Sequence, residues 1–280
     1  MVGSRRRPAI NSSALHVFDV LRFVAAAPEA LGVTEISRRL NLPASTVHRA
    51  LSSLEETDFI QRYQNTPSFE LGMMPHLLNR AFLNHFALHD ASRPMLHVLA
   101  SETGLTVSLW HRLGWYAVRI GGAFGSQDVH HRARFGDTEQ LHEGPGPSAI
   151  LAYLQPQERE AYARFAAARF TDPPLAPGGW PELERELTQV RERGYASQAL
   201  PIGRDHHAVA LPVRDAQERV VASLSVEGAH EQARPTKALL EAREAVEARL
   251  RADPERFVSP FAHMAPDDIF IRIPRQGDAD

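Results

Sequence analysis

The stretch Thr34–Leu54, TEISRRLNLPASTVHRALSSL, contains two short amphipathic segments separated by Asn41-Leu42-Pro43. Pro43 is compatible with the first turn of the second segment, because a helix does not need a backbone N–H there. The apolar residues of that segment recur every three or four positions, the spacing of one buried helical face: Val47, Ala50, Leu51 and Leu54. Two amphipathic helices joined by so short a break predict a helix-turn-helix.

The opposite face of the second helix is polar, with hydroxyl and basic groups and no carboxylate before Glu55. Such a face can approach a phosphate backbone and reach base edges in a major groove. The alternative is an ordinary helical hairpin, in which Arg49 is a surface residue paired with an acid such as Glu35. The candidate DNA contacts are Ser45, Thr46, His48, Arg49, Ser52 and Arg62.

The segments around this stretch predict a complete winged helix. Residues 13–27 have helical apolar spacing and stop near Pro28, and two short apolar runs flank a turn at Asn65-Thr66-Pro67. Three helices and a two-stranded hairpin give a winged helix-turn-helix over 13–72. Arg62, in the first strand, either contacts a phosphate or is simply a solvated strand residue.

Composition limits the class of protein. A length of 280 residues is compatible with two domains, and the absence of Cys excludes disulfides and thiolate metal sites and is compatible with a cytoplasmic protein. A net charge of −3 is no signature of a whole-chain nucleic-acid binder, although a local basic face suffices for specific binding. No apolar run predicts a membrane span or a signal peptide. Residues 1–12 are expected to be a flexible basic tail, either an arm along DNA or inert.

The pattern changes after the wing. Residues 73–90 predict a linker helix, whose apolar stripe is expected to pack on the same helix of a second subunit, and Pro94 is expected to open another helix. Period-2 runs then predict strands at 106–110, 116–120, 129–135, 208–213 and 220–227, with helices at 148–154, 157–170, 181–193 and 236–250. Residues 91–250 are therefore expected to form an α+β domain with an antiparallel sheet, followed by a proline-broken extension, 251–280.

Many short motifs occur in order across both halves: TEISRRLNLPASTVHRALSSLEE, FELG, SETG, AILAYL, RERGYA, LPV and VVASLSVEG. Together they resemble the IclR family of bacterial transcriptional regulators. The resemblance implies a winged helix, a linker helix and a GAF/PAS-like effector-binding domain. It also implies operator binding as a dimer or dimer of dimers, under the control of a small metabolite, often a carboxylate or aromatic acid.

The sequence departs from the family at positions that the resemblance places in the pocket. An acid after the GYA strand, a Cys before LPV and a Ser near the end of VVASLSVSG are replaced by Gln198, Ala208 and Glu227, while Ser225 is kept. The turn after Leu141-His142 reads EGPGPS in place of the family's Gly-Lys. These changes mean that a ligand cannot be transferred from a family member.

The candidate effector site combines these positions with nearby basic residues. The Gly-Pro turn is expected to form the pocket floor, with free N–H groups facing a carboxylate, or else to be a plain loop. Histidines and Arg119 could bind an anion, a histidine set with Glu227 could bind a metal ion, or the histidines could be surface residues. The candidate residues are Arg119, His130, Gly144, Gly146, Ser148, Gln198, His206, Ala208, Ser225 and Glu227.

No motif of a metal site, a phosphate loop or a nucleophile elbow is found, so neither a metal nor a cofactor nor catalysis is predicted. The first hypothesis is a transcriptional regulator with operator DNA and a small, anionic effector as partners. A second is a regulator whose sheet domain only dimerises, and a third is an enzyme with an accessory winged helix.

Overall fold

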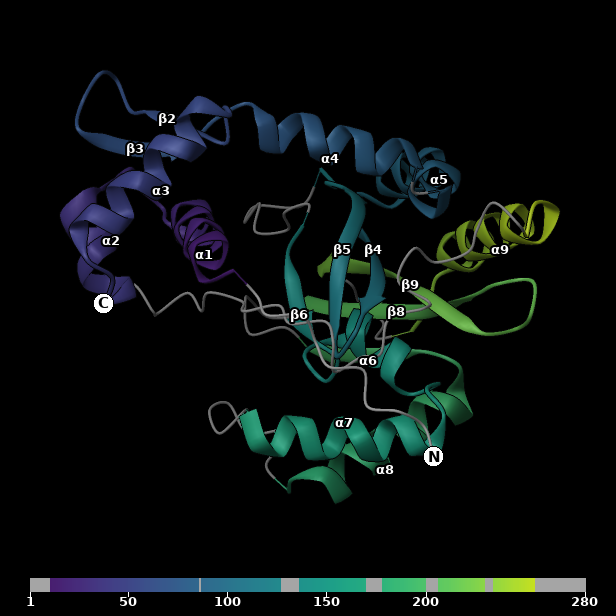
Figure 1. Cartoon of the computed structure of the whole chain (residues 1–280). Helices are drawn as coiled ribbons and strands as arrows, with labels where there is room; N and C mark the ends of the chain where they lie inside the picture. Colours follow the sequence, from purple (N-terminus) through teal and green to yellow (C-terminus); the bar gives the residue numbers. More distant parts are fainter. Residues whose placement is uncertain are drawn as a thin grey trace. The chain divides into compact units, whose positions relative to one another are not determined.

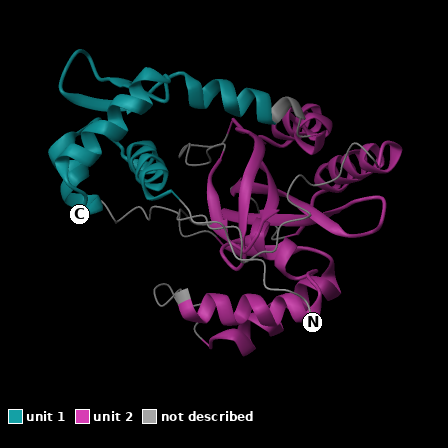
Figure 2. Cartoon of the chain, viewed as in Figure 1, with its two compact units in different colours: residues 1–85, 272–280 teal, residues 86–271 magenta. Residues whose placement is uncertain are grey.

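The computed structural model describes residues 11–85, 87–126, 136–169, 178–199, 206–229 and 234–254. The chain divides into two compact units, with the division between residues 85 and 86 (Figure 2). The predicted strand 129–135, the candidate His130, and most of the tail 1–12 and of the extension 251–280 lie outside the described residues. Within the described part, no helix is long and apolar enough to cross a membrane.

The first unit contains the predicted winged helix. Its elements are α1 (Ser12–Ala26), β1 (Leu31–Gly32), α2 (Val33–Leu40), α3 (Ala44–Glu56), β2 (Ile60–Arg62) and β3 (Ser68–Leu71) (Figure 1). Asn11 caps α1, because its side chain accepts a hydrogen bond from the Ser13 N–H. The α2–α3 turn depends on Asn41, whose left-handed φ of 51° ends α2, and on Ser37, whose hydroxyl donates to the Leu42 carbonyl.

The core of this unit confirms the helical periodicity predicted for the second half of Thr34–Leu54. Val47, Ala50, Leu51 and Leu54 of α3 are buried against α1 and α2. The wing has three strands, whereas the sequence predicted two, because β1 pairs with β3 through Leu31 and Phe69. A two-residue strand carries no detectable period, so it could not be predicted.

The linker region contains two helices, α4 (Met74–His85) and α5 (Ala87–Thr103). The expected helix start at Pro94 is wrong, because α5 begins at Ala87 and runs through that proline. The expected boundary between residues 90 and 91 therefore falls inside α5. An interior proline leaves a helical carbonyl without its usual partner. In the turn before Pro94, Arg249 also donates to the carbonyl of the buried Ala91 at 2.8 Å.

The second unit is an α+β domain around one antiparallel sheet. It includes α5 together with β4 (Thr106–Leu113), β5 (Tyr116–Ala123), β6 (Thr138–Gln140), α6 (Pro145–Leu151), α7 (Pro156–Arg169), α8 (Trp180–Arg193), β7 (Ala196–Ala199), β8 (His206–Arg214), β9 (Val220–Ala229) and α9 (Lys237–Ala252). The strand order is β6-β5-β4-β9-β8-β7, and every pair is antiparallel.

Helices cover the two faces of this sheet differently (Figure 1). The face against α5 and α9 is apolar and forms the main core, with Leu96, Leu109, Leu211, Leu224 and Val246 among its buried residues. The short helix α6 packs on the other face, against β4, β8 and β9. It begins at Pro145, three residues before its predicted start, because Gly144 and Pro145 form its first turn.

Candidate functional site

The sheet face beneath α6 is polar, in contrast to the apolar face beneath α5 and α9. Alternate residues of a strand share a face, and β4 pairs with β9 without a register shift. Ser108 therefore lies opposite Ser225, and Trp110 opposite Ser223. The polar face accordingly carries Thr106, Ser108, Trp110, Ser223, Ser225 and Glu227, of which all but Glu227 are buried.

Trp110 lies at the centre of this face. Its indole Nε1 donates to the Ser225 hydroxyl at 3.1 Å, and the Arg119 guanidinium lies 4.4 Å from the ring centroid. Gly146 of α6 packs so closely on the indole that a Cβ there would lie 2.4 Å from two of its atoms. Only glycine permits this approach, so Gly146 and Trp110 together fix the distance between α6 and the sheet.

The start of α6 is fixed by its own backbone and by β9. Gly144 has a φ of 72°, a conformation that favours glycine, and the Ser148 N–H donates to its carbonyl at 3.2 Å. The Ser223 hydroxyl donates to the Gly146 carbonyl at 2.6 Å. The Ser148 N–H is therefore bonded within α6. It is not one of the free N–H groups that were expected to face a carboxylate at the pocket floor.

Arg119 of β5 is the buried cation of the site, with 7% of its surface exposed. One of its terminal nitrogens donates to the Ser108 hydroxyl, and its face stacks on Trp110. Its Nε is buried and makes no hydrogen bond to any described residue. The nearest carboxylate oxygen, from Asp137, is 3.9 Å away, too far for a hydrogen bond. The site thus holds a buried charged group, the Nε–H of Arg119, that can donate one further hydrogen bond.

Glu139 of β6 lies beside this cation and beside the start of α6. It pairs with Ala117, two residues from Arg119 on β5, and a Cβ on Gly144 would lie 3.6 Å from its Oε2. Burial raises the pKa of Glu139 to about 7, and the nearby charge of Arg119 only partly opposes this. The site therefore contains a carboxyl group that changes charge near neutral pH.

The structure brings together some of the predicted effector residues and separates others. Arg119, Gly146 and Ser225 meet around Trp110. Ala208 pairs with both Glu227 and Gln198, but Gln198 is exposed on the edge strand β7. The remaining predicted residues take these positions: His206 partly buried on the Ala208 side of β8, Ser148 partly buried with its hydroxyl 3.5 Å from the His142 carbonyl, and Gly144 at the N-cap of α6.

Three residues of the site were not predicted from the sequence: Ser108, Trp110 and Glu139. Ser108 and Trp110 alternate with apolar residues in a strand that was predicted, so their shared face could have been inferred. Glu139 lies in β6, a three-residue strand that the sequence did not reveal.

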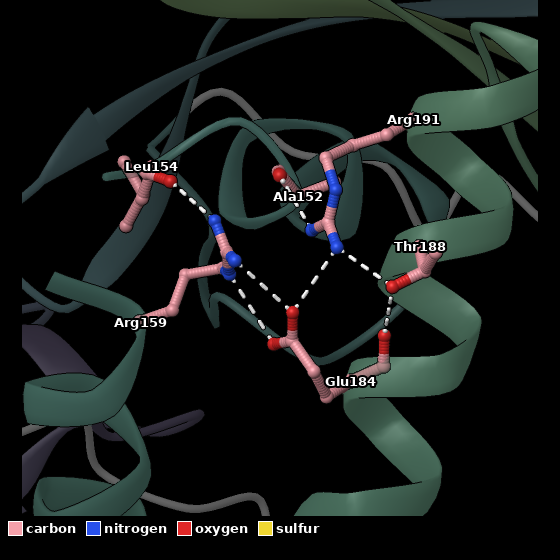
Figure 3. A network of polar contacts seen from close by, with 6 residues as sticks. All are labelled: Ala152, Leu154, Arg159, Glu184, Thr188 and Arg191. Atoms are coloured by element: carbon pink, nitrogen blue, oxygen red, sulfur yellow. Dashed lines mark hydrogen bonds and ion pairs between the residues drawn. The ribbon is translucent and has the colours of Figure 1, made fainter. Parts of the chain in front are cut away.

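The far end of α6 is held by a charged network between α7 and α8 (Figure 3). Glu184 of α8 forms ion pairs of 3.1 Å with both Arg159 and Arg191. Arg159 also donates to the Leu154 carbonyl at 2.7 Å, and Arg191 to the Ala152 carbonyl at 3.0 Å. Both carbonyls lie in the turn that follows α6, so the network fixes this turn. It also ties α6 to α7 and α8.

His142, two residues before Gly144, bonds within the second unit. His142 lies within 2.6 Å of the Tyr162 hydroxyl, and burial lowers its pKa to about 4, so it is neutral at physiological pH. Among the described residues no three His, Asp or Glu side chains gather as a metal site.

Five of the six predicted DNA-contacting residues lie on one helix of the first unit, α3, and the sixth, Arg62, lies on β2. Ser45, His48, Arg49 and Ser52 of α3 are exposed, and Thr46 is partly exposed. Glu35 bonds with Arg38 and Arg39 at 2.8 and 2.9 Å, and no ion pair of Arg49 is found within the described ranges. Arg62 differs, because it forms a 3.1 Å ion pair with Glu55 and stacks on Phe69.

A winged helix joined to an α+β domain with a polar, partly charged sheet face defines a helix-turn-helix regulator with a ligand-binding domain. The family described as IclR helix-turn-helix domain matches residues 13–63, and the family described as bacterial transcriptional regulator IclR C-terminal matches residues 80–251. The chain therefore belongs to the IclR family of bacterial transcriptional regulators.

Curated relatives and solved structures agree with this assignment. The chain is 28% identical over 211 residues to the regulator BhcR of Paracoccus denitrificans, covering 75% of each protein. It is 26% identical over 246 residues to the repressor AllR of Escherichia coli, covering 86% of each. An IclR homolog from Microbacterium hydrocarbonoxydans, solved with 4-hydroxybenzoate, has a TM-score of 0.73 at 22% identity, covering 86% of this chain and 99% of the other. The last of these comparisons shows the shared fold.

Proposed function

We propose that this regulator binds operator DNA through α3 and that a small anionic acid, held on the polar sheet face beneath α6, controls that binding. The observation that carries the effector part is the buried Arg119, whose Nε has no hydrogen-bond partner among the described residues. A buried guanidinium with a free donor is costly unless a bound group accepts from it. A carboxylate is the group that matches its geometry and charge.

For the DNA-binding part, the proposed contacts are Ser45, Thr46, His48, Arg49, Ser52 and Arg62. The exposure of the α3 side chains and the freedom of Arg49 from Glu35 support a role in contacting DNA. Arg62 is the weakest candidate, because a phosphate would compete with Glu55 for it.

We also propose that two copies of the chain act together, so that the operator is an inverted repeat. The support is a set of apolar side chains that α1 and α4 leave exposed, between 47% and 58% of each: Leu15, Phe18, Leu77 and Leu78. Apolar surface of this kind is typical of an interface between proteins.

In this proposal the acid shifts the population between arrangements that bind DNA and arrangements that do not. Arg119 stacks on Trp110, and Trp110 packs against Gly146, so a ligand at Arg119 also acts on the position of α6. The aromatic acid bound by the Microbacterium homolog provides a first probe.

The alternative is a sheet domain that only dimerises. The observation that favours it is Trp110, a large side chain that fills the space directly behind Gly146. The polar character of the face and the buried charge of Arg119 favour the effector role instead.

The test begins with selection of bound duplexes from a random DNA pool, followed by titration of the selected operator with 4-hydroxybenzoate, benzoate, pyruvate and other acids. We expect at least one acid to change operator affinity, and Arg119→Gln to abolish the response while DNA binding persists. Arg185→Gln, an exposed arginine of α8, is the control and should respond like the parent chain. Operator binding that no acid changes would favour the dimerisation role.

A further inference from the structure

We propose that α3, the base of the wing and the start of α4 form one rigid body, held together by backbone hydrogen bonds around Asp58, so that a rotation of α4 turns α3 with it. Both helices belong to the first unit (Figure 2). The inference rests on the proposed role of α3 in DNA binding. It adds the element through which the rest of the chain orients that helix, and it places no hinge between the wing and the linker helix.

α3 ends in a left-handed turn at Asp58. This residue has a φ of 56°, and its N–H donates to the Glu55 carbonyl at 3.1 Å. The next N–H, that of Phe59, donates to the Leu54 carbonyl at 2.9 Å. The two bonds form a Schellman motif, in which glycine is the usual residue at the left-handed position. Backbone bonds therefore fix the direction in which the chain leaves α3.

The start of α4 is bonded to the same turn. Only Gly72 and Met73 lie between β3 and α4. The Gly72 N–H donates to the Phe59 carbonyl at 2.9 Å, and the Met74 N–H donates to the Asp58 carbonyl at 3.0 Å. The first N–H groups of a helix have no partner within that helix, so the bond from Met74 uses a donor that the helix itself leaves open. α4 is thereby attached to the end of α3 at its first residue.

Gly72 also packs directly on this turn. A Cβ at Gly72 would lie 2.3 Å from the Asp58 carbonyl oxygen and 3.2 Å from the Ile60 carbonyl carbon. Both are backbone atoms, which cannot turn aside as the end of a side chain can. The chain therefore leaves β3 at a distance from the end of α3 that only glycine permits. We call Asp58, Phe59, Gly72 and Met74 the α3–α4 junction.

The junction leaves little backbone that could act as a hinge. A hinge needs a few residues at the end of an element whose φ and ψ can change. Met73 lies between two bonded N–H groups, and its own carbonyl accepts from the His76 and Leu77 N–H groups at 3.1 and 3.2 Å. A rotation of α4 at this point either breaks the bond from Met74 to Asp58 or turns the end of α3 with it.

Double electron–electron resonance between α3 and α4 tests the rigid body directly. The chain has no cysteine, so Ser53→Cys on α3 and Asn79→Cys on α4, both at exposed positions, provide the only two sites for spin labels. An excess of unlabelled chain removes distances between copies. We expect one narrow distance distribution, the same with and without operator DNA. A broad or two-peaked distribution in the parent chain would mean a hinge at the junction, and the proposal would be wrong.

A series at Asp58 changes the junction through its backbone, because this side chain is exposed. Asp58→Gly adopts the left-handed conformation more readily, whereas Asp58→Val opposes it, since β-branched residues rarely have a positive φ. We expect the distance distribution to stay narrow in Asp58→Gly and to broaden in Asp58→Val. Gly72→Ala should broaden it as well, because its Cβ meets the Asp58 carbonyl. Gly32→Ala, in the same unit, is the control, since its Cβ would meet nothing within 4 Å.

Hydrogen exchange, measured at single residues by mass spectrometry, separates a loosened junction from an unfolded unit. The Met74 N–H should exchange slowly in the parent chain, because it is bonded to Asp58. In Asp58→Val and Gly72→Ala it should exchange rapidly, while the N–H of the buried Leu51 in α3 stays protected. Rapid exchange at Met74 in the parent chain would overturn the proposal, whatever the variants do.

The operator assay separates this proposal from the function on which it rests. When two copies bind one operator, the spacing of the half-sites depends on how firmly each α3 is held. One base pair inserted between the half-sites should weaken binding strongly for the parent chain and for Gly32→Ala, and less for Asp58→Val. Equal losses in all three would mean that the junction does not orient α3. If the chain selects no duplex, the DNA-binding role is wrong, and the distance distribution still decides whether α3 and α4 form one body.

Discussion

Trp110 on β4 donates from its indole Nε1 to the hydroxyl of Ser225 on β9, at 3.1 Å. This bond joins two central strands of the sheet on the face that α6 covers. It also sets the orientation of the ring on which Arg119 stacks and against which Gly146 packs. One buried hydrogen bond therefore orients the surface on which the proposed effector binds.

Trp110→Phe should remove this hydrogen bond while an aromatic ring remains beneath Arg119. The loss should cost about 0.5–1.5 kcal/mol of unfolding free energy, and the affinity for an acid should fall. Urea unfolding followed by circular dichroism measures the first quantity. In a double-mutant cycle with Ser225→Ala, the two changes should not add, because each removes the same bond. Fully additive costs would show that the bond contributes nothing.

Gly146→Ala should destabilise the second unit by about 1–3 kcal/mol, because its Cβ would lie 2.4 Å from indole atoms and α6 or Trp110 must move. The chain has three tryptophans, Trp110, Trp115 and Trp180, all in this unit, so their fluorescence follows its unfolding alone. Gly32→Ala, whose Cβ would meet nothing within 4 Å, is the control for replacing a glycine; because it lies in the first unit, its unfolding is followed by circular dichroism. An unchanged midpoint for Gly146→Ala would contradict the close packing.

Glu184→Gln should loosen the end of α6. The carboxylate bonds two arginines that also hold the Ala152 and Leu154 carbonyls, and both guanidiniums are mostly buried. Loss of the shared acid should cost about 1–3 kcal/mol by urea unfolding. Glu186→Gln, an exposed position on the same helix, should change stability by less than about 0.5 kcal/mol. Equal effects of the two changes would show that the network does not hold α6.

The sequence predicted the winged helix well because its signals are local. The α3 core residues follow a helical period within one helix, and Asn41-Leu42-Pro43 marks the turn. The prediction was wrong where tertiary contacts decide. Pro94 is accommodated inside α5, and β1 exists because Leu31 pairs with a strand far along the chain.

The polar cluster that we propose as the effector site could be anticipated only in part from the sequence, for the same reason. Arg119 and Ser225 were identified, but the residue that brings them together, Trp110, was not. The pairing of β4 with β9 joins residues that are more than a hundred positions apart, and no local pattern specifies that register. Glu139 gains its unusual pKa from burial and from charges on three other segments, which the sequence alone does not place together.

Arg49→Ala should weaken operator binding, because this exposed arginine is not bonded to Glu35. If it contacts a phosphate, the slope of log affinity against log salt should fall by about one unit; if it reads a base, discrimination at one base pair should fall by about 1–3 kcal/mol. Fluorescence anisotropy over a range of salt concentrations measures both. Arg185→Ala, on the second unit, is the control. An unchanged affinity and slope for Arg49→Ala would exclude this residue from the DNA interface.

Glu139 should make the second unit less stable as pH rises towards neutrality. Burial raises its pKa from 4.5 to about 7, so its contribution is fully present below pH 4.5 and is lost as pH rises through 7. The loss should approach about 3 kcal/mol, the free-energy equivalent of that shift. His111 and His142 act in the opposite direction between about pH 4 and 6.5, because burial lowers both pKa values to about 4.

The stability of the parent chain alone therefore cannot show the effect of Glu139. The difference in unfolding free energy between the parent chain and Glu139→Gln can show it. That difference, from urea unfolding followed by tryptophan fluorescence, should shift in favour of the variant between pH 4.5 and about 7. A difference independent of pH would show that Glu139 titrates normally.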